Sequence, residues 1–124
     1  MHACLKDRAL DSLHMATSGE IRLAYRRHVA PGFRHHNAWF AGDAESLMLG
    51  MEENHERFPR KLVQVHHALE EGDIVAVHSH VRLQADDRGM ALAHIFRFEG
   101  GLVAELRDLG QPVPGQMQNE HGMF

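Results

Sequence analysis

The hydrophobic pattern of the chain changes its period near the middle, and this change limits the folds that the chain can adopt. In the first half, apolar residues such as Leu5, Ala9 and Leu13 recur at helical spacing. In the second half, four short segments rich in Val, Ile, Leu and Phe are separated by turn signals. Helices followed by hairpin-connected strands predict an α+β protein in which three N-terminal helices pack on a curved antiparallel sheet.

Turn and capping signals set the expected boundaries. Gly19 ends the first helix, and Ser18 can cap a second helix that stops at Pro31. Asp43 can cap a third helix, which Pro59 ends. The four expected strands span residues 62–69, 74–83, 90–98 and 102–109. Proline and glycine predict an irregular C-terminal tail over residues 111–124, and we expect a single domain over residues 1–124.

Composition excludes several classes of protein. Thirteen Lys and Arg face seventeen Asp and Glu, and no basic stripe is present, so we expect no nucleic-acid partner. There is no run of about 18 apolar residues, and charges begin at Lys6, so we expect neither a membrane partner nor a signal peptide. Cys4 is the only cysteine, which excludes an internal disulfide and fits the expectation of a cytoplasmic protein.

Twelve histidines stand out in the composition, and several fall on expected strands. Because side chains alternate along a strand, His78, His80 and Arg82 share one face. A five-residue loop over residues 85–89 would place His80 opposite His94 in the next strand. The expected pairing therefore brings these four side chains together.

The turn between the last two strands decides where Asp108 points. A three-residue loop over residues 99–101 would bring Asp108 to the face that carries His94, diagonal to it. A two-residue turn would send Asp108 to the opposite face. We expect the three-residue loop, because it yields one aliphatic face and one face with polar groups. The polar face then carries His78, His80, Arg82, His94 and Asp108 among Leu92, Phe96 and Leu106.

Histidines mixed with leucine and phenylalanine predict the lining of a pocket covered by helices. The alternative is that these histidines are half-exposed residues of a solvated sheet. For Asp108, the alternative to a functional role is an ion pair with Arg82 or Arg107.

Several strings of the sequence, taken in order, resemble the polyketide-cyclase-like (SnoaL-like) branch of the nuclear-transport-factor-2-like superfamily. They are residues 33–37 (FRHHN), 71–80 (EGDIVAVHSH), 95–105 (IFRFEGGLVAE) and 111–114 (QPVP), with Asn119, Gly122, Met123 and Phe124 in the tail. The resemblance runs from about residue 15 to the end. It implies a cone-shaped barrel, in which a strongly curved sheet and three helices enclose one internal cavity, and a homodimer that forms through the outer face of the sheet.

The resemblance also implies roles for individual residues. In the cyclases of this branch, a carboxylate on the last long strand is the acid/base and a histidine on the preceding strand lies near it. Asp108 and His94 match these two positions, and Asn37 matches a polar residue after the second helix. Many relatives carry histidine where this chain has Leu106, and aspartate where it has His94.

We therefore expect a small-molecule enzyme of the cyclase or isomerase type that needs no cofactor. Asp108 would remove a proton next to a carbonyl of an apolar molecule, and His94, with His80 or Arg82, would donate hydrogen bonds to the enolate oxygen. Aldol closure or a double-bond shift would follow. The main alternative is a non-catalytic domain that binds such a molecule. Further expected contacts of the substrate are His36, Asn37 and Trp39.

A metal site is the third hypothesis. His78 and His80 follow Gly72 with the spacing that opens a cupin metal motif, and both imidazoles would share a face. The glutamate expected a few residues later is absent, and so is the second cupin motif. We therefore expect no metal. The sequence also leaves open which member of the pair His66 and His67 faces inward.

Overall fold

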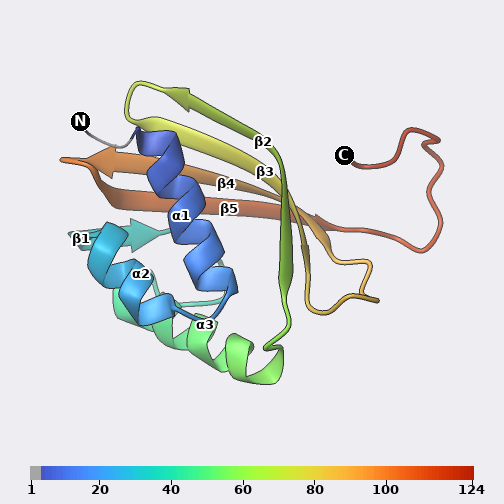
Figure 1. The fold of residues 1–124 in the computed structure, drawn as a ribbon, viewed down its shortest axis with the longest axis horizontal. Helices are drawn as coiled ribbons and strands as arrows, with labels where there is room; N and C mark the ends of the chain where they lie inside the picture. The colour runs from blue at the N-terminus through green and yellow to red at the C-terminus, as the bar shows by residue number, and fades with distance from the viewer. Residues whose placement is uncertain (1–3) are drawn as a thin grey trace.

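The computed structural model describes residues 4–124 and places three helices against one five-stranded sheet (Figure 1). The helices are α1 (Leu5–Thr17), α2 (Ile21–His28) and α3 (Ala44–Arg57). The strands are β1 (Val29–His35), β2 (Leu62–Glu71), β3 (Ile74–Arg82), β4 (Met90–Glu99) and β5 (Leu102–Pro112). The predicted α+β class, with three helices packed on a sheet, is confirmed.

The strands lie in the order β1-β5-β4-β3-β2, and the sheet is not closed into a barrel. Strands β2 to β5 form the expected antiparallel meander, whereas β1 runs parallel to β5, so the sheet is mixed. The prediction that Pro31 ends a helix is wrong, because α2 ends at His28 and Pro31 lies within β1. A proline is tolerated there because β1 is an edge strand and its pairing is interrupted between Val29 and Arg34.

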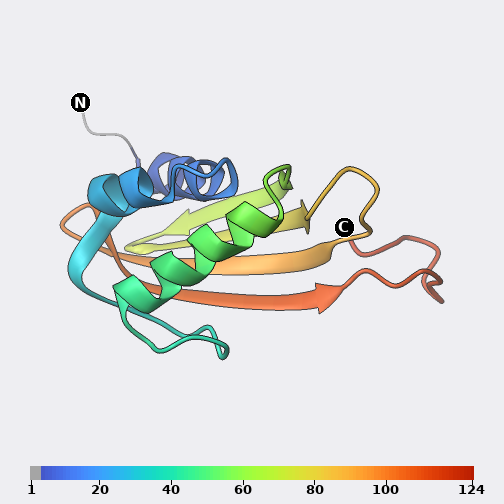
Figure 2. The same ribbon diagram turned by 90° about the horizontal axis from the view of Figure 1, so that it is seen from below.

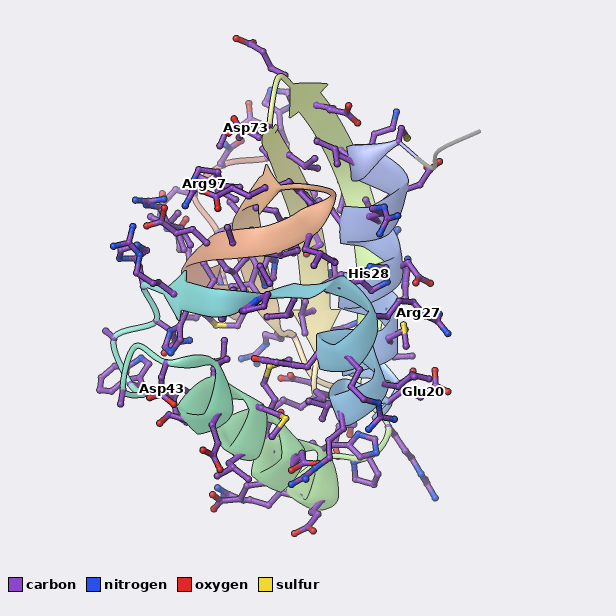
Figure 3. The ribbon with its side chains drawn as sticks, turned by 90° about the vertical axis from the view of Figure 1, so that its left-hand side faces the viewer. Glu20, Arg27, His28, Asp43, Asp73 and Arg97 are labelled. Atoms are coloured by element: carbon purple, nitrogen blue, oxygen red, sulfur yellow. The ribbon has the colours of Figure 1, made fainter. Side chains whose placement is uncertain are left out.

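Of the two predicted side-chain caps, Ser18 for α2 and Asp43 for α3, only the second is observed. Asp43 caps α3 as predicted: its carboxylate accepts hydrogen bonds from the backbone N–H of Ser46 at 2.9 Å and from its hydroxyl at 2.7 Å (Figure 3). Ser18 does not cap α2, because its hydroxyl donates to the carbonyl oxygen of Met15 at the end of α1. Helix α2 begins at Ile21 instead.

The three helices cover one face of the sheet, here called the inner face, and leave the outer face bare of helices (Figure 2). The core lies between the helices and the inner face. Its buried members are Ala9, Leu13, Phe33, Leu47, Val75, Val77, Phe96, Phe98 and Val103. Odd positions of β3 and even positions of β4 therefore point into the core, and the remaining positions of these strands point outward.

The pairing of β3 with β4 differs from the predicted one. Val77 lies opposite His94, and His80 lies opposite Ala91, so the prediction that His80 faces His94 is wrong. The loop is wider than expected, because the carboxylate of Asp87 accepts a hydrogen bond from the backbone N–H of Leu83 and holds a broad turn. This register moves His78, His80 and Arg82 to the outer face.

The hairpin between β4 and β5 also differs from the expected one, but it keeps the expected outcome. Glu99 pairs with Leu102 around a two-residue turn, in which both glycines have positive φ. The register then shifts by one residue beside Phe98, at a β-bulge. Because of the bulge, Asp108 returns to the inner face and lies directly opposite His94 rather than diagonal to it.

Strand β5 continues to Pro112, and residues 113–124 contain no helix or strand. Within the described residues, no helix combines the length and the apolar character that a membrane span requires.

Candidate functional site

Asp108 and His94 form a cross-strand pair on the inner face of the sheet, near the ends of α1 and α3. Directly opposite residues of an antiparallel ladder have Cβ atoms roughly 4.5–5.5 Å apart. Asp108 is half-buried, and the side-chain N–H of Asn37 donates a hydrogen bond to its Oδ2 at 2.9 Å. The carboxylate therefore has one defined amide partner.

Neither arginine that could neutralise Asp108 contacts it. Arg107 pairs with Glu105 at 3.3 Å, and Arg82 donates to the carbonyl oxygen of Ala85. The alternative of a structural ion pair between Asp108 and Arg82 or Arg107 is therefore not seen among residues 4–124. An aspartate without a cationic partner, set beside apolar side chains, keeps a carboxylate that can accept a proton.

His94 is half-buried in the site. Burial lowers the pKa of its imidazole, and the nearby charge of Asp108 opposes this shift in part. Its Nδ1 atom is buried and has no hydrogen-bond partner within the described part of the chain. A neutral ring near pH 7 keeps one N–H that can donate to a ligand.

Asn37 is oriented by its own loop. Its Oδ1 accepts a hydrogen bond from the backbone N–H of Trp39 at 2.9 Å, which directs the amide NH2 group toward Asp108. Its backbone N–H donates to Nδ1 of the buried His35 at 3.1 Å. The loop after β1 is tied to β5 as well, because the backbone N–H of His36 donates to the carbonyl oxygen of Leu106.

Asp108, His94 and Asn37 line an open pocket of about 520 Å3 on the inner face. Its apolar lining includes Leu13, Leu83, Met90 and Leu92, and its rim includes Trp39, whose side chain is 87% exposed. A smaller pocket of about 210 Å3 adjoins it. Four residues line both pockets: Asn37, Asn54, Lys61 and Asp108.

The remaining predicted contacts are only partly in this site. Leu106 lines the smaller pocket, whereas Phe96 is buried in the core. His36 borders the larger pocket, but its ring pairs with Glu105 at 2.5 Å. The bond from His36, together with that from Arg97, lowers the pKa of Glu105 to about 2. His36 therefore belongs to a hydrogen-bonded network around Glu105, beside the site.

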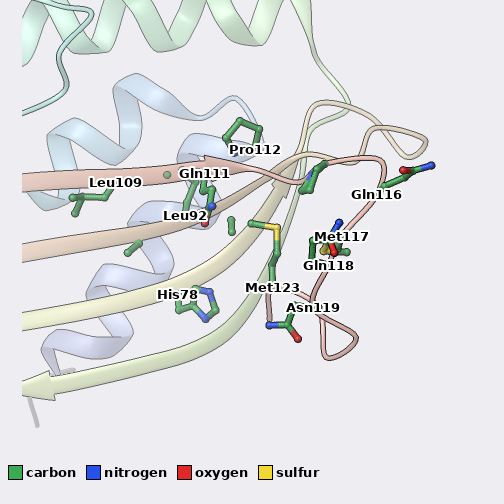
Figure 4. Close-up of a pocket in the computed structure, with 15 residues that line it drawn as sticks. His78, Leu92, Leu109, Gln111, Pro112, Gln116, Met117, Gln118, Asn119 and Met123 are labelled. Atoms are coloured by element: carbon green, nitrogen blue, oxygen red, sulfur yellow. The ribbon is translucent and has the colours of Figure 1, made fainter.

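The structure separates His78, His80 and Arg82 from Asp108 and His94. His78 lines another pocket, of about 1040 Å3, between the outer face and the C-terminal tail (Figure 4). The ring of His80 is hydrogen-bonded to the carbonyl oxygen of Arg88 at 2.6 Å and lies 4.5 Å from the ring of Phe124. The expectation that these three side chains share a face with His94 is wrong, because the wider loop shifts the register by three residues.

Neither His66 nor His67 faces inward, because a bulge in β2 places both rings beside that of His78 on the outer face. His67 pairs with His78 and its ring stacks on that of His78, at 5.6 Å. His66 falls in the bulge, and its ring stacks on that of Phe124 at 4.7 Å. Within residues 4–124, no group of three or more His, Cys, Asp or Glu side chains is arranged to hold a metal ion.

The structure adds two residues that the sequence reasoning missed. Lys61 follows α3 directly before β2, and its Nζ donates to Oδ1 of Asn54 at 2.5 Å. Asn54 could have been found from spacing, because it follows Leu47 and Met51 on the apolar stripe of α3. No pattern in the sequence marks Lys61, because it lies outside any helix or strand.

Comparison with known proteins identifies the family. The family model of the SnoaL-like domain matches residues 11–106, about three quarters of the chain. The chain belongs to the SnoaL-like domain family. The match includes Asn37 and His94 and ends two residues before Asp108. No curated protein sequence matches the chain.

Solved structures support the same fold for this SnoaL-like domain. An NTF2-like protein of unknown function from Cytophaga hutchinsonii has a TM-score of 0.71 and 18% identity, and the match covers 90% of this chain and 94% of that one. A candidate SnoaL-like polyketide cyclase from a Jannaschia species has a TM-score of 0.66 and 21% identity, with 90% of each chain covered. A candidate polyketide cyclase from Acidithiobacillus ferrooxidans has a TM-score of 0.69 and 14% identity, covering 90% of this chain and 91% of that one.

Proposed function

We propose that this SnoaL-like domain is an enzyme that removes a proton next to a carbonyl group of a small apolar molecule. The observation that carries the proposal is the position of Asp108: it faces a pocket, lies opposite His94, and has an amide rather than a cation as its hydrogen-bond partner. The likeness to candidate polyketide cyclases agrees with this chemistry and shows the fold.

In the proposed reaction, the carboxylate of Asp108 takes the proton from the carbon next to the carbonyl. The negative charge passes from Asp108 to the carbonyl oxygen, which becomes an enolate. The N–H of the neutral His94 ring can donate to that oxygen, and Asn37 keeps the carboxylate oriented during the transfer. His80 and Arg82, which the sequence suggested for this role, lie on the outer face.

The enolate can then follow two courses. It can attack a second carbonyl of the same molecule and close a ring, or it can take the proton back from Asp108 at another carbon and shift a double bond. Leu13, Met90 and Leu92 favour an apolar ligand, and the open rim beside Trp39 accommodates one that extends beyond the pocket.

The proposal is tested in deuterium oxide with benzylacetone, a small methyl ketone that carries a phenyl ring. Proton NMR would follow the replacement of its α-hydrogens by deuterium, with wild type and with Asp108→Asn. We expect wild type to exchange the α-hydrogens faster than buffer alone, and Asp108→Asn to lose this activity while it keeps its circular dichroism spectrum. If wild type binds the ketone but causes no exchange, the protein is a ligand-binding domain and the proposed reaction is rejected.

A further inference from the structure

Among the described residues, Lys61 is the only lysine or arginine that lines the two adjoining pockets on the inner face. The chain has two lysines and eleven arginines, so arginine is its usual cation. The other lysine, Lys6, lies in the first turn of α1 and lines none of the pockets described above. The lysine at position 61 is therefore an exception both in residue type and in place.

Lys61 is half-buried and has an amide rather than a carboxylate as its partner. Its Nζ is held by Oδ1 of Asn54 at 2.5 Å, and no carboxylate within residues 4–124 forms a salt bridge with it. Burial lowers the pKa of its ammonium group. Asp108 lines the same pockets without pairing with Lys61, so the two groups flank one space. A neutral amine is a nucleophile toward carbonyl carbon, which is how lysines in apolar pockets act.

We propose that Lys61 forms a reversible imine with a carbonyl ligand in the inner pocket, with Asp108 placed to take the α-proton of that imine. This inference rests on the proposed function, because it assumes that the ligand carries a carbonyl group. It narrows the substrate class to ketones and aldehydes, since carboxylic acids and amides do not form imines.

The imine forms through a carbinolamine. Lys61 first gives its ammonium proton to solvent; the free amine then adds to the carbonyl carbon and, after proton transfer from nitrogen to oxygen, gives a carbinolamine. The hydroxyl takes a proton from solvent at the open pocket and leaves as water, so a positively charged iminium remains. The carboxylate of Asp108 removes the α-proton, and the C–H electron pair forms the enamine and neutralises the nitrogen. Return of the proton and addition of water reverse the sequence and free Lys61.

The imine can be trapped with a hydride donor. Wild-type protein would be incubated with benzylacetone and sodium cyanoborohydride, which reduces an iminium to a stable secondary amine. Peptide mapping by mass spectrometry would then compare the adduct at Lys61 with the adducts at Lys6 and at the α-amino group. We expect the adduct at Lys61 to exceed that at Lys6 on the order of tenfold, because the ligand is held beside the amine. Equal labelling of the two lysines would overturn the proposal.

Variants complete the test. Lys61→Arg keeps a positive charge but cannot form an imine, and we expect it to lose α-hydrogen exchange by on the order of tenfold or more, whereas the matched variant Lys6→Arg keeps the wild-type rate. Wild-type exchange in Lys61→Arg would overturn the imine. The trapping of the unaltered wild type does not depend on whether the variant folds.

The inference and the proposed function fail in different ways. If Lys61 is not trapped but exchange still requires Asp108, the imine is wrong and the proposed function stands. If Lys61 is trapped and Asp108→Asn exchanges at the wild-type rate, the role of Asp108 is wrong and the imine stands.

Discussion

His94 on β4 and Asp108 on β5 lie directly opposite each other, and one β-bulge is responsible. The hairpin that joins these strands turns at two glycines, and an unbroken ladder from that turn would place Asp108 on the outer face. The extra residue beside Phe98 reverses this outcome before the strands reach the site. The proposed acid/base pair therefore depends on an irregularity of the backbone that lies at a distance from it.

Asn37 is expected to affect the rate of proton removal by Asp108, whose carboxylate it contacts. Asn37→Ala removes the hydrogen bond to Asp108, and a hydrogen bond to a charged group contributes about 1.5–3 kcal/mol, so we expect the α-exchange rate of benzylacetone to fall by roughly tenfold to a hundredfold. Asn37→Asp would place a second carboxylate at the same distance. Because like charges raise a carboxyl pKa, its exchange activity should move to higher pH than that of wild type. An unchanged pH profile in Asn37→Asp would argue against contact between these two residues.

The pH dependence of stability should reflect the lowered pKa of the half-buried His94. The folded pKa of His94 is lowered from 6.5 by burial, so the unfolded chain binds more protons there than the folded one once the pH falls below about 6.5. The contribution of neutral His94 to stability is therefore complete above pH 6.5 and is lost as the pH falls from there toward its folded pKa. We expect the Tm of His94→Leu to decline less than that of wild type over this range, as followed by circular dichroism. Parallel curves would contradict the burial of His94.

Glu105 should also lose stability as the pH falls, but in a lower pH range than His94. Its folded pKa is lowered from 4.5 to about 2, first by the bond from His36 and then by that from Arg97. Its contribution to stability is therefore complete above pH 4.5 and is lost as the pH falls toward 2. Glu105→Gln should lower the Tm at neutral pH, and the difference from wild type should shrink as the pH falls from 4.5 toward 2. A difference that stays constant over this range would mean that the ion pairs do not stabilise the fold.

Variants of His78 and His94 compare the effects of the outer and inner faces of the sheet on activity. His78→Ala alters the outer face and should leave the α-exchange rate within about twofold of wild type, since surface changes have small effects. His94→Leu alters the inner face and should lower the rate by on the order of a hundredfold, the contribution of one pre-oriented donor. If His78→Ala lowers the rate as much as His94→Leu does, the assignment of the site to the inner face is wrong.

The fold class could be predicted from the sequence because the hydrophobic period records it locally, as in Leu5, Ala9 and Leu13 of α1. The face shared by His94 and Asp108 was also predicted, but from a turn that the structure does not contain. Register depends on bulges and on loop hydrogen bonds, such as the one that Asp87 accepts, and composition does not encode these. Lys61 was missed because only the tertiary fold brings it to the pocket.

The pairing of β1 with β5 could not be predicted for a similar reason. Pro31 is a strong signal for the end of a helix, and only the edge position of β1 makes it acceptable in a strand. His78 and His80 were grouped with His94 by strand alternation, which is correct within β3 but depends on register between strands.

A crystal structure of the protein with benzylacetone bound would show directly whether Asp108 reaches the carbon that loses its proton. We predict that the ketone occupies the inner pocket, with its α-carbon about 3–3.5 Å from a carboxylate oxygen of Asp108. A ketone bound only between the outer face and the C-terminal tail, or with its α-carbon turned away from Asp108, would contradict it.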